Sequence, residues 1–247
     1  MSKLLWDQSG ERRYETGCDH GVLYTEKVTT AGDPRAFKTA SPWNGLTSVT
    51  DSPSGADAND IYADNMLYAS LRAAEKFGGT IEAYTYPDAF AACNGEGSPD
   101  GVTGLRVGQQ SRAPFGFCYR SDIGDDTDTS VDPDKNYKLH LWWNCTASPS
   151  DRQYSTINES PDAITMSWEI SCIPNAISGM KPSAWMVIDT TKCTQTELEH
   201  LAVLEEVLYG RNAVVGDNPV AEIVPYLPTP DEVISIFKTG TVTAIPA

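Results

Sequence analysis

The chain has 247 residues, of which 40% are hydrophobic, and it carries a formal net charge of −16. This length and composition predict a folded chain with a sizeable core and exclude global disorder. The balance of 34 Asp and Glu against 18 Lys and Arg disfavours specific binding of nucleic acid, because phosphate binding depends on Lys and Arg.

The N-terminal sequence MSKLLWDQSGERR contains one apolar run, Leu4–Trp6, which is too short for the core of a signal peptide. No stretch approaches the roughly 20 apolar residues that span a membrane. The six cysteines lie far apart in the sequence, so no C-x-x-C pair indicates a zinc site or a redox motif. We therefore expect a protein made in the cytosol, with buried free thiols and with no metal or cofactor.

The first notable stretch in chain order is GERRYETGCDHGVLY, residues 10–24, in which Cys18, Asp19 and His20 are adjacent. In an extended segment, Cys18 and His20 would share one face and Asp19 would lie on the other. A catalytic Cys–His pair needs a third orienting group, and the chain offers two other histidines. We expect His140 on the polar face of a strand and His200 on the exposed face of a helix. We therefore interpret the cluster as non-catalytic.

Most of the chain has the sequence pattern of β-strands. Alternating apolar and polar residues predict strands over 139–145, 166–172 and 184–188. Weaker patterns predict further strands, and turn-rich sequence separates all of them, as in an antiparallel sandwich or barrel. The weaker strand predictions cover 45–49, 80–86 and 114–120.

One helix is well indicated near the C-terminal end, over about 194–209. Thr194 and Glu197 fit a capping box, apolar residues recur at helical spacing from Leu198 to Leu208, and Gly210 can end the helix in a left-handed conformation. Residues 66–77 are rich in helix formers, so this segment is predicted either as a short helix or as a strand followed by a turn.

No low-complexity linker divides the chain, so we predict one domain over residues 1–247. Its candidate appendages are an N-terminal arm over 1–24, an extension over 25–42, an acidic loop over 121–135 and a C-terminal arm over 211–247. The acidic loop lacks the residue order of an EF-hand, so a solvated loop is favoured over a calcium site. Its acids are Asp122, Asp125, Asp126, Asp128, Asp132 and Asp134.

The stretch over residues 10–24 closely resembles the N-terminal signature of the tail tube, or major tail, proteins of long-tailed bacteriophages. That signature runs roughly G-E-R-x-Y-E-T-G-x-D-x-G-V-L-Y, and Cys18 and His20 fall outside its matched positions. The resemblance continues along most of the chain. It includes WNGLTSVTDSPSGA (43–56), YADN (62–65), FGGTIEAYTYPDAF (77–90), the GQQ…FGFCYR region (108–120), NYKLH (136–140), SPDAITMSWEIS (160–171), LEEVLYG (204–210) and LPTPDEVISIF (227–237).

The resemblance implies a mainly β, sandwich-like or barrel-like subunit with one flanking helix and extended arms. Six such subunits would form a ring by pairing their inner strands, and hexameric rings would stack into a tube. The lumen would hold the tape measure protein and later conduct double-stranded DNA without binding it specifically. The resemblance also implies contacts with tail tip and tail terminator proteins, a location in the virion, no membrane contact and no enzymatic activity.

By the same resemblance, arms make the contacts between subunits and between rings. One set of contact residues comes from the N-terminal arm and one from the segment 227–237, with part of 121–135 or of 28–42 as an insertion loop. Charged residues would form ion pairs, and the tyrosines would supply amphipathic contact area. The assigned residues are Glu11, Arg12, Tyr14, Glu15, Tyr24, Pro230 and Phe237.

Four acids on or beside predicted strands are candidates for lining the lumen: Asp60, Asp64, Glu82 and Glu169. A carboxylate-lined bore would repel phosphates and so let a polyanion pass. The alternative is that each acid lies on a solvated outer face, because the sequence does not tell which face of the sheet turns inward.

A competing interpretation is a monomeric β-sandwich module that binds carbohydrate on Trp142, Trp143 or Trp185. It predicts ligand affinity in a discrete monomer and no self-assembly. A third class, an acidic hydrolase, predicts turnover that falls when one carboxylate is neutralised. No sequence feature favours either of these two classes.

Overall fold

The computed structural model describes residues 4–100, 102, 104–127, 136–154, 156–157, 163–213 and 221–245. Antiparallel strands dominate this part of the chain, and helices flank them, so the predicted fold class is confirmed. The predicted acidic loop lies partly outside the described residues, at 128–135, as does part of the predicted C-terminal arm, at 214–220 and 246–247.

A nine-stranded antiparallel sheet forms the body of the described structure. Its strands are β1 (Tyr14–Lys27), β2 (Arg35–Pro42), β3 (Leu46–Asp51), β8 (Gly78–Ala83), β9 (Phe115–Gly124), β10 (Tyr137–Ala147), β11 (Met166–Cys172), β14 (Trp185–Asp189) and β15 (Leu227–Pro228). They follow the order β15-β2-β1-β9-β10-β11-β8-β3, and β14 also pairs with β10. The six strand segments expected from alternation all fall on strands of this sheet.

Residues 21–24 of β1 and most of the central strands β9 and β10 are buried on both faces. On one face, Leu23, Phe117 and Trp142 belong to a core that also holds Trp43 and Trp168. The backbone N–H of Trp43 donates to the carbonyl of Gly21 at 2.8 Å, so the chain just before β3 lies against β1 and the strands curl around this core. The sequence alternation therefore identified the strands but not the burial of their second face.

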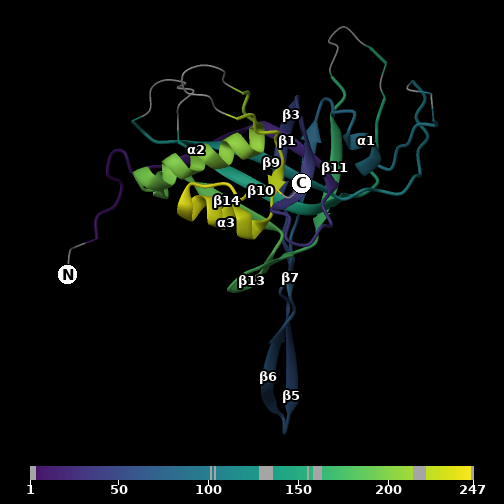
Figure 1. Cartoon of the computed structure of the whole chain (residues 1–247). Coiled ribbons are helices and arrows are strands. Elements are labelled where there is room, and N and C mark those ends of the chain that lie inside the picture. Colours follow the sequence, from purple (N-terminus) through teal and green to yellow (C-terminus); the bar gives the residue numbers. More distant parts are fainter. Residues whose placement is uncertain are drawn as a thin grey trace.

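The second core lies between the sheet and two helices, α2 (Gln195–Tyr209) and α3 (Pro230–Thr239), which pack side by side (Figure 1). The predicted capping box of α2 is confirmed, with both reciprocal hydrogen bonds between Thr194 and Glu197. Gly210 ends α2 with φ 88° and ψ 160°, which is a positive φ but not the left-handed helical conformation we predicted.

The sequence predicted one flanking helix, α2. The described residues also form a second flanking helix, α3, and a short helix, α1 (Phe90–Cys93), which precedes β9. Thr229 caps α3, Pro230 occupies its first turn and Gly240 ends it at φ 65° and ψ 19°. A short 3-10 helix, η1 (Thr190–Lys192), leads into α2.

Two segments differ from the sequence-based expectation. The predicted extension over 25–42 is the end of β1, a turn and β2, whose side chain Phe37 is fully buried, so it belongs to the sheet. Residues 66–72 and 75–76 form strands. Of the two alternatives predicted for this segment, the strand is therefore correct and the helix is wrong.

The remaining strands form three two-stranded sheets. One is the hairpin β12–β13, and the other two lie along a ribbon that projects far from the body (Figure 1). Their bounds are β4 (Ser54–Gly55), β5 (Ala58–Ala63), β6 (Met66–Arg72), β7 (Glu75–Lys76), β12 (Asn175–Ile177) and β13 (Met180–Ser183).

Candidate functional site

The projecting ribbon is the continuation of β3 and β8 beyond the body of the subunit (Figure 1). It ends in a two-residue turn in which Asp64 and Asn65 have φ values of 52° and 62°. Positive φ at both positions is the geometry of a tight hairpin turn, and Asp and Asn adopt it more readily than most residues. From Ser52 to Asp64 the ribbon extends roughly 40 Å, at about 3.3 Å per residue.

The pairing register of the body is kept in the ribbon as far as Ile61, and it shifts by one residue between Ile61 and Tyr62. Thr50 pairs with Thr80 in the body, and Asp60 pairs with Ser70 in the ribbon, at equal separations along both strands. Because side chains alternate between faces, Ile61, Ala69 and Leu71 share one face of the ribbon. Beyond the shift, Met66 lies opposite Ala63 and Leu67 lies opposite Tyr62. Gly55 and Ala56 have positive φ values of 88° and 59°, so the regular alternation of faces is interrupted where the ribbon leaves the body.

One side of the ribbon is apolar although no core covers it. Ile61, Met66 and Leu71 are 40%, 64% and 56% exposed. An isolated two-stranded ribbon is marginally stable in water, and an apolar face of this kind is typical of a surface that a partner covers. By register, the residues of this face are Ile61, Ala63, Met66, Ala69 and Leu71.

Sequence reasoning missed this surface. The signal that could have found it is the alternation of Ala69 and Leu71 with polar residues, in a segment that we also considered as a helix. Two turn residues precede that segment, as a hairpin requires.

Of the four candidate lumen acids, Glu82 and Glu169 share the polar outer face of β8 and β11. Ser167 lies opposite Glu82, and Thr80 lies opposite Glu169, so the two carboxylates are diagonal neighbours. Ser48 donates a hydrogen bond from its hydroxyl to Glu82 at 2.8 Å. This face is therefore polar and acidic.

Asp60 lies in the ribbon opposite Ser70, on the side away from Ile61. Asp64 stands in the turn at the end of the ribbon. The structure therefore groups two of the proposed acids on one face of β8 and β11 and places the other two in the ribbon.

Cys18, Asp19 and His20 do not follow regular alternation. The register between β1 and β9 shifts on both sides of Asp19, and His20 has a φ of 50°. As a result Asp19 and His20 lie together, with 2.8 Å between the Asp19 Oδ1 and His20 Nδ1 atoms, while Cys18 packs against the first core. The prediction that Cys18 and His20 share a face against Asp19 was wrong.

Arg120 of β9 joins this group to α2. Its guanidinium lies 2.7 Å from His20 Nδ1, 3.5 Å from Asp19 Oδ1 and 3.8 Å from Glu205 Oε1. It also stacks over the Tyr137 ring, 4.6 Å from the centroid. These contacts link β1, β9, β10 and α2, which explains the cluster as an element of the fold.

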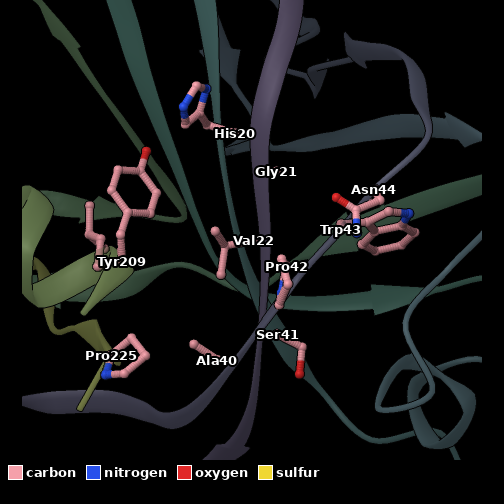
Figure 2. A pocket seen from close by; sticks show the side chains of 11 residues that line it. His20, Gly21, Val22, Ala40, Ser41, Pro42, Trp43, Asn44, Tyr209 and Pro225 are labelled. Carbon is pink, nitrogen blue, oxygen red and sulfur yellow. The ribbon is translucent and has the colours of Figure 1, made fainter. Parts of the chain in front are cut away.

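A pocket of about 430 Å³ opens beside His20, between β1, β2 and the C-terminal end of α2 (Figure 2). The rings of His20 and Tyr209 lie on one side of it, with centroids 6.1 Å apart. Val22, Pro42 and Pro225 contribute apolar surface. Its lining is mixed and partly apolar.

The N-terminal contact residues divide into exposed and buried groups. Glu11 is exposed, and Arg12 lies 3.8 Å from Asp7 and 3.9 Å from Asp126. The arm that leaves the sheet covers residues 4–13, because β1 begins at Tyr14. It also carries the exposed apolar residues Leu4, Leu5 and Trp6.

Three of the N-terminal contact residues belong to β1. Tyr14 is 48% exposed, and Glu15 forms an ion pair with Lys138. Tyr24 is fully buried, and its hydroxyl donates to the carbonyl of Leu208 at 2.9 Å. The expectation that Tyr24 offers contact area to another subunit is therefore wrong for this structure.

The predicted C-terminal arm is likewise packed against the body over 227–239. Pro230 is buried in the first turn of α3, and Phe237 is half-buried against the second core. His200, expected on an exposed face, is half-buried, and its Nδ1 lies 2.9 Å from the Phe237 carbonyl. These residues stabilise the subunit and do not form a free arm.

His140 is buried, contrary to the expectation of a polar strand face. Its ring stacks on Tyr119 with 4.4 Å between centroids, and its Nε2 lies 2.9 Å from the Ser121 hydroxyl. Its Nδ1 has no hydrogen-bond partner in the described structure. Burial lowers the pKa of His140 to about 4, so the ring is neutral near pH 7.

The tryptophans proposed as sugar platforms are mostly unavailable. Trp142 and Trp143 are 1% and 0% exposed. Trp185 is 41% exposed, but its ring stacks on Phe77 with 5.6 Å between centroids. Trp142 and Trp143 therefore cannot stack on a sugar in this conformation.

No family model and no curated protein matches this chain. Among the described residues, no group of three or more His, Cys, Asp or Glu side chains is arranged to hold a metal ion. Within the same part of the chain, no helix combines the length and apolarity needed to cross a membrane.

Proposed function

We propose that this chain is the structural subunit of a bacteriophage tail tube, in which six copies close a ring and rings stack into a hollow tube. The role is one of assembly and conduction and involves no catalysis. The observation that carries the proposal is the ribbon of residues 52–76, whose apolar side has no covering partner within the described chain.

The ribbon suits contact with further copies of the same chain. It extends beyond the body, so its apolar side can lie against another subunit without displacing the core. Burying Ile61, Met66 and Leu71 together would contribute several kcal/mol, at about 1.5–3 kcal/mol for each side chain fully buried. Closure into a ring also gives partners to the exposed edges of the sheet, which otherwise promote open-ended aggregation.

The acidic face supports conduction of a polyanion. Glu82 and Glu169 share one polar face of β8 and β11, and Asp60 adds a carboxylate in the ribbon. If this face lines the lumen, repeated carboxylates repel DNA phosphates and prevent adhesion. The net charge of −16 agrees with such a role.

In this proposal the N-terminal segment over residues 4–13 makes a second contact between subunits, through Leu4, Leu5 and Trp6 and through the charges of Glu11 and Arg12. The lumen holds the tape measure protein before DNA passes. Tail tip and tail terminator proteins bind the two ends of the tube. The protein is made in the host cytoplasm and resides in the virion.

Electron microscopy of the purified chain at increasing concentration tests the proposal. The wild type should form six-fold rings or hollow tubes. Ile61→Ser, Met66→Ser and Leu71→Ser combined should abolish assembly, with an unchanged melting temperature for the body. The matched control combines Asp60→Asn and Ser70→Ala, which change the opposite side of the same ribbon.

The control should assemble as the wild type does. Wild-type protein that stays monomeric at every concentration, or an apolar-side variant that assembles normally, would contradict the proposal. In the first case, binding to a glycan array would test the carbohydrate-binding alternative.

A further inference from the structure

Cys145 and Cys172 face each other on neighbouring strands of the main sheet. The register of β10 and β11 pairs the two residues directly, and their Sγ atoms lie 3.1 Å apart. The backbone N–H of Ile173 donates to the carbonyl of Asn144 at 3.2 Å. A hydrogen bond between these flanking residues marks the cysteines as a non-hydrogen-bonded pair, the kind in which side chains approach most closely.

This placement meets the requirements of a disulfide. In a non-hydrogen-bonded pair the Cα atoms lie about 4.5 Å apart, within the range of about 4.4–6.8 Å that a disulfide spans. The Sγ atoms must approach by about 1 Å to reach the bond length of about 2.05 Å. Side-chain rotation can supply this movement while the strands keep their register.

The surroundings of the pair favour one thiol as the point of attack. Cys145 is fully buried, whereas Cys172 is 8% exposed. Burial raises the pKa of the Cys145 thiol, so it reacts poorly with a reagent in solution. Cys93 lies in the same core, and Cys118 lies in the second core.

We propose that Cys145 and Cys172 are a site of oxidative modification, which closes a cross-strand disulfide between β10 and β11 when the protein meets a hydroperoxide. The Cys172 thiolate attacks one peroxide oxygen, the O–O bond breaks, and the departing hydroxide takes a proton to give water. The resulting sulfenic acid is then attacked by the Cys145 sulfur, the S–S bond forms, and a second water leaves.

The reaction balances without any other participant. Two thiols and one hydrogen peroxide give one disulfide and two waters, and the two electrons pass from sulfur to the peroxide oxygens. The bond would restrict the unfolded chain over residues 145–172 and so stabilise the folded form. This inference does not depend on the proposed assembly.

The test treats the full chain with hydrogen peroxide and counts free thiols after denaturation. Two of the six cysteines should become inaccessible to a thiol reagent. Trypsin digestion without reduction should give one linked pair of peptides, 139–152 and 153–192, because Lys181 precedes a proline and is not cleaved; each peptide contains a single cysteine. The melting temperature should rise by roughly 5–10 °C and fall again with dithiothreitol.

Cys145→Ala and Cys172→Ala should each abolish the linked pair and the rise in melting temperature. Cys118→Ala is the matched control, because Cys118 is also buried on a central strand, and it should keep both effects. The treatment is repeated at a urea concentration that partly unfolds the chain, so that access of peroxide to the pair does not limit the reaction.

Six free thiols under both conditions would overturn the proposal. So would a linked pair that contains Cys93, or oxidation of Cys172 to sulfinic acid without a cross-link.

Discussion

Glu82 and Glu169 are diagonal neighbours on the polar face of β8 and β11, each opposite a hydroxyl residue of the other strand. Ser167 lies across from Glu82, and Thr80 lies across from Glu169. Residues in this relation are about 7–8 Å apart, close enough for like charges to repel. This face therefore holds two neighbouring negative charges whose mutual repulsion does not stabilise the fold.

Reversing these two charges should convert a repelling lumen into a binding one. In assembled tubes, Glu82→Lys combined with Glu169→Lys should retain short double-stranded DNA, with affinity that falls steeply as salt increases. Wild-type tubes should retain none. The measurement is co-sedimentation of labelled DNA with tubes between low and physiological salt.

The matched control for charge reversal is Glu199→Lys combined with Glu222→Lys, which makes the same change in net charge at exposed positions elsewhere. It should leave retention near the wild-type level. Equal retention by the two double variants would show that net charge decides binding, and it would contradict a lumen lined by Glu82 and Glu169.

The buried His140 should make stability depend on pH. Its pKa is lowered from 6.5 to about 4 by burial, so the unfolded chain binds a proton at a higher pH than the folded chain does. Stability is therefore fully present above about pH 6.5 and is lost as the pH falls towards 4. Between pH 7 and 4.5 this loss should amount to about 2–3 kcal/mol.

Urea unfolding at the two pH values, compared with His140→Phe, isolates this contribution. The phenylalanine keeps a ring on Tyr119 but does not titrate. The variant should therefore lose about 2–3 kcal/mol less stability than the wild type between the two pH values. The other titrating groups, including the neighbouring Glu15, are common to both proteins. Equal losses would mean that His140 is protonated in the folded chain.

Gly79 should tolerate no side chain. A Cβ atom there would lie 2.5 Å from the Thr50 carbonyl oxygen, on the backbone of β3, and 2.7 Å from the Trp142 ring of the first core. We expect Gly79→Ala to reduce the free energy of unfolding by about 1–3 kcal/mol. At Gly104 a Cβ meets no atom within 4 Å, so Gly104→Ala should change the free energy of unfolding by less than about 0.5 kcal/mol. Chemical denaturation of both variants provides the check.

Local patterns were sufficient where an element is specified by its own residues. The period of two predicted β10, β11 and β14, and the Thr194–Glu197 capping box predicted the start of α2. The start of α3 was also readable, because Thr229, Pro230 and Gly240 are cap residues in the right order. We missed it because the resemblance assigned that segment to an arm.

Non-local pairing determined what the sequence could not reveal. Residues 66–72 have helix-forming composition, but pairing with β5 makes them a strand. The bulge that brings Asp19 beside His20 depends on the register of β1 against β9. The burial of Tyr24 depends on α2, which lies far along the chain and covers the second face of the sheet.

Tyr24 provides the sharpest distinction between a contact residue and a core residue. Its hydroxyl donates to the Leu208 carbonyl at 2.9 Å in a fully buried site, so Tyr24→Phe leaves a buried acceptor unpaired. We expect a loss of about 1–3 kcal/mol in the free energy of unfolding, with assembly unaffected. Tyr14→Phe, at a half-exposed position on the same strand, should change stability by less than about 0.5 kcal/mol. Denaturant unfolding and electron microscopy of both variants test this, and impaired assembly of Tyr24→Phe at unchanged subunit stability would restore Tyr24 as a contact between subunits.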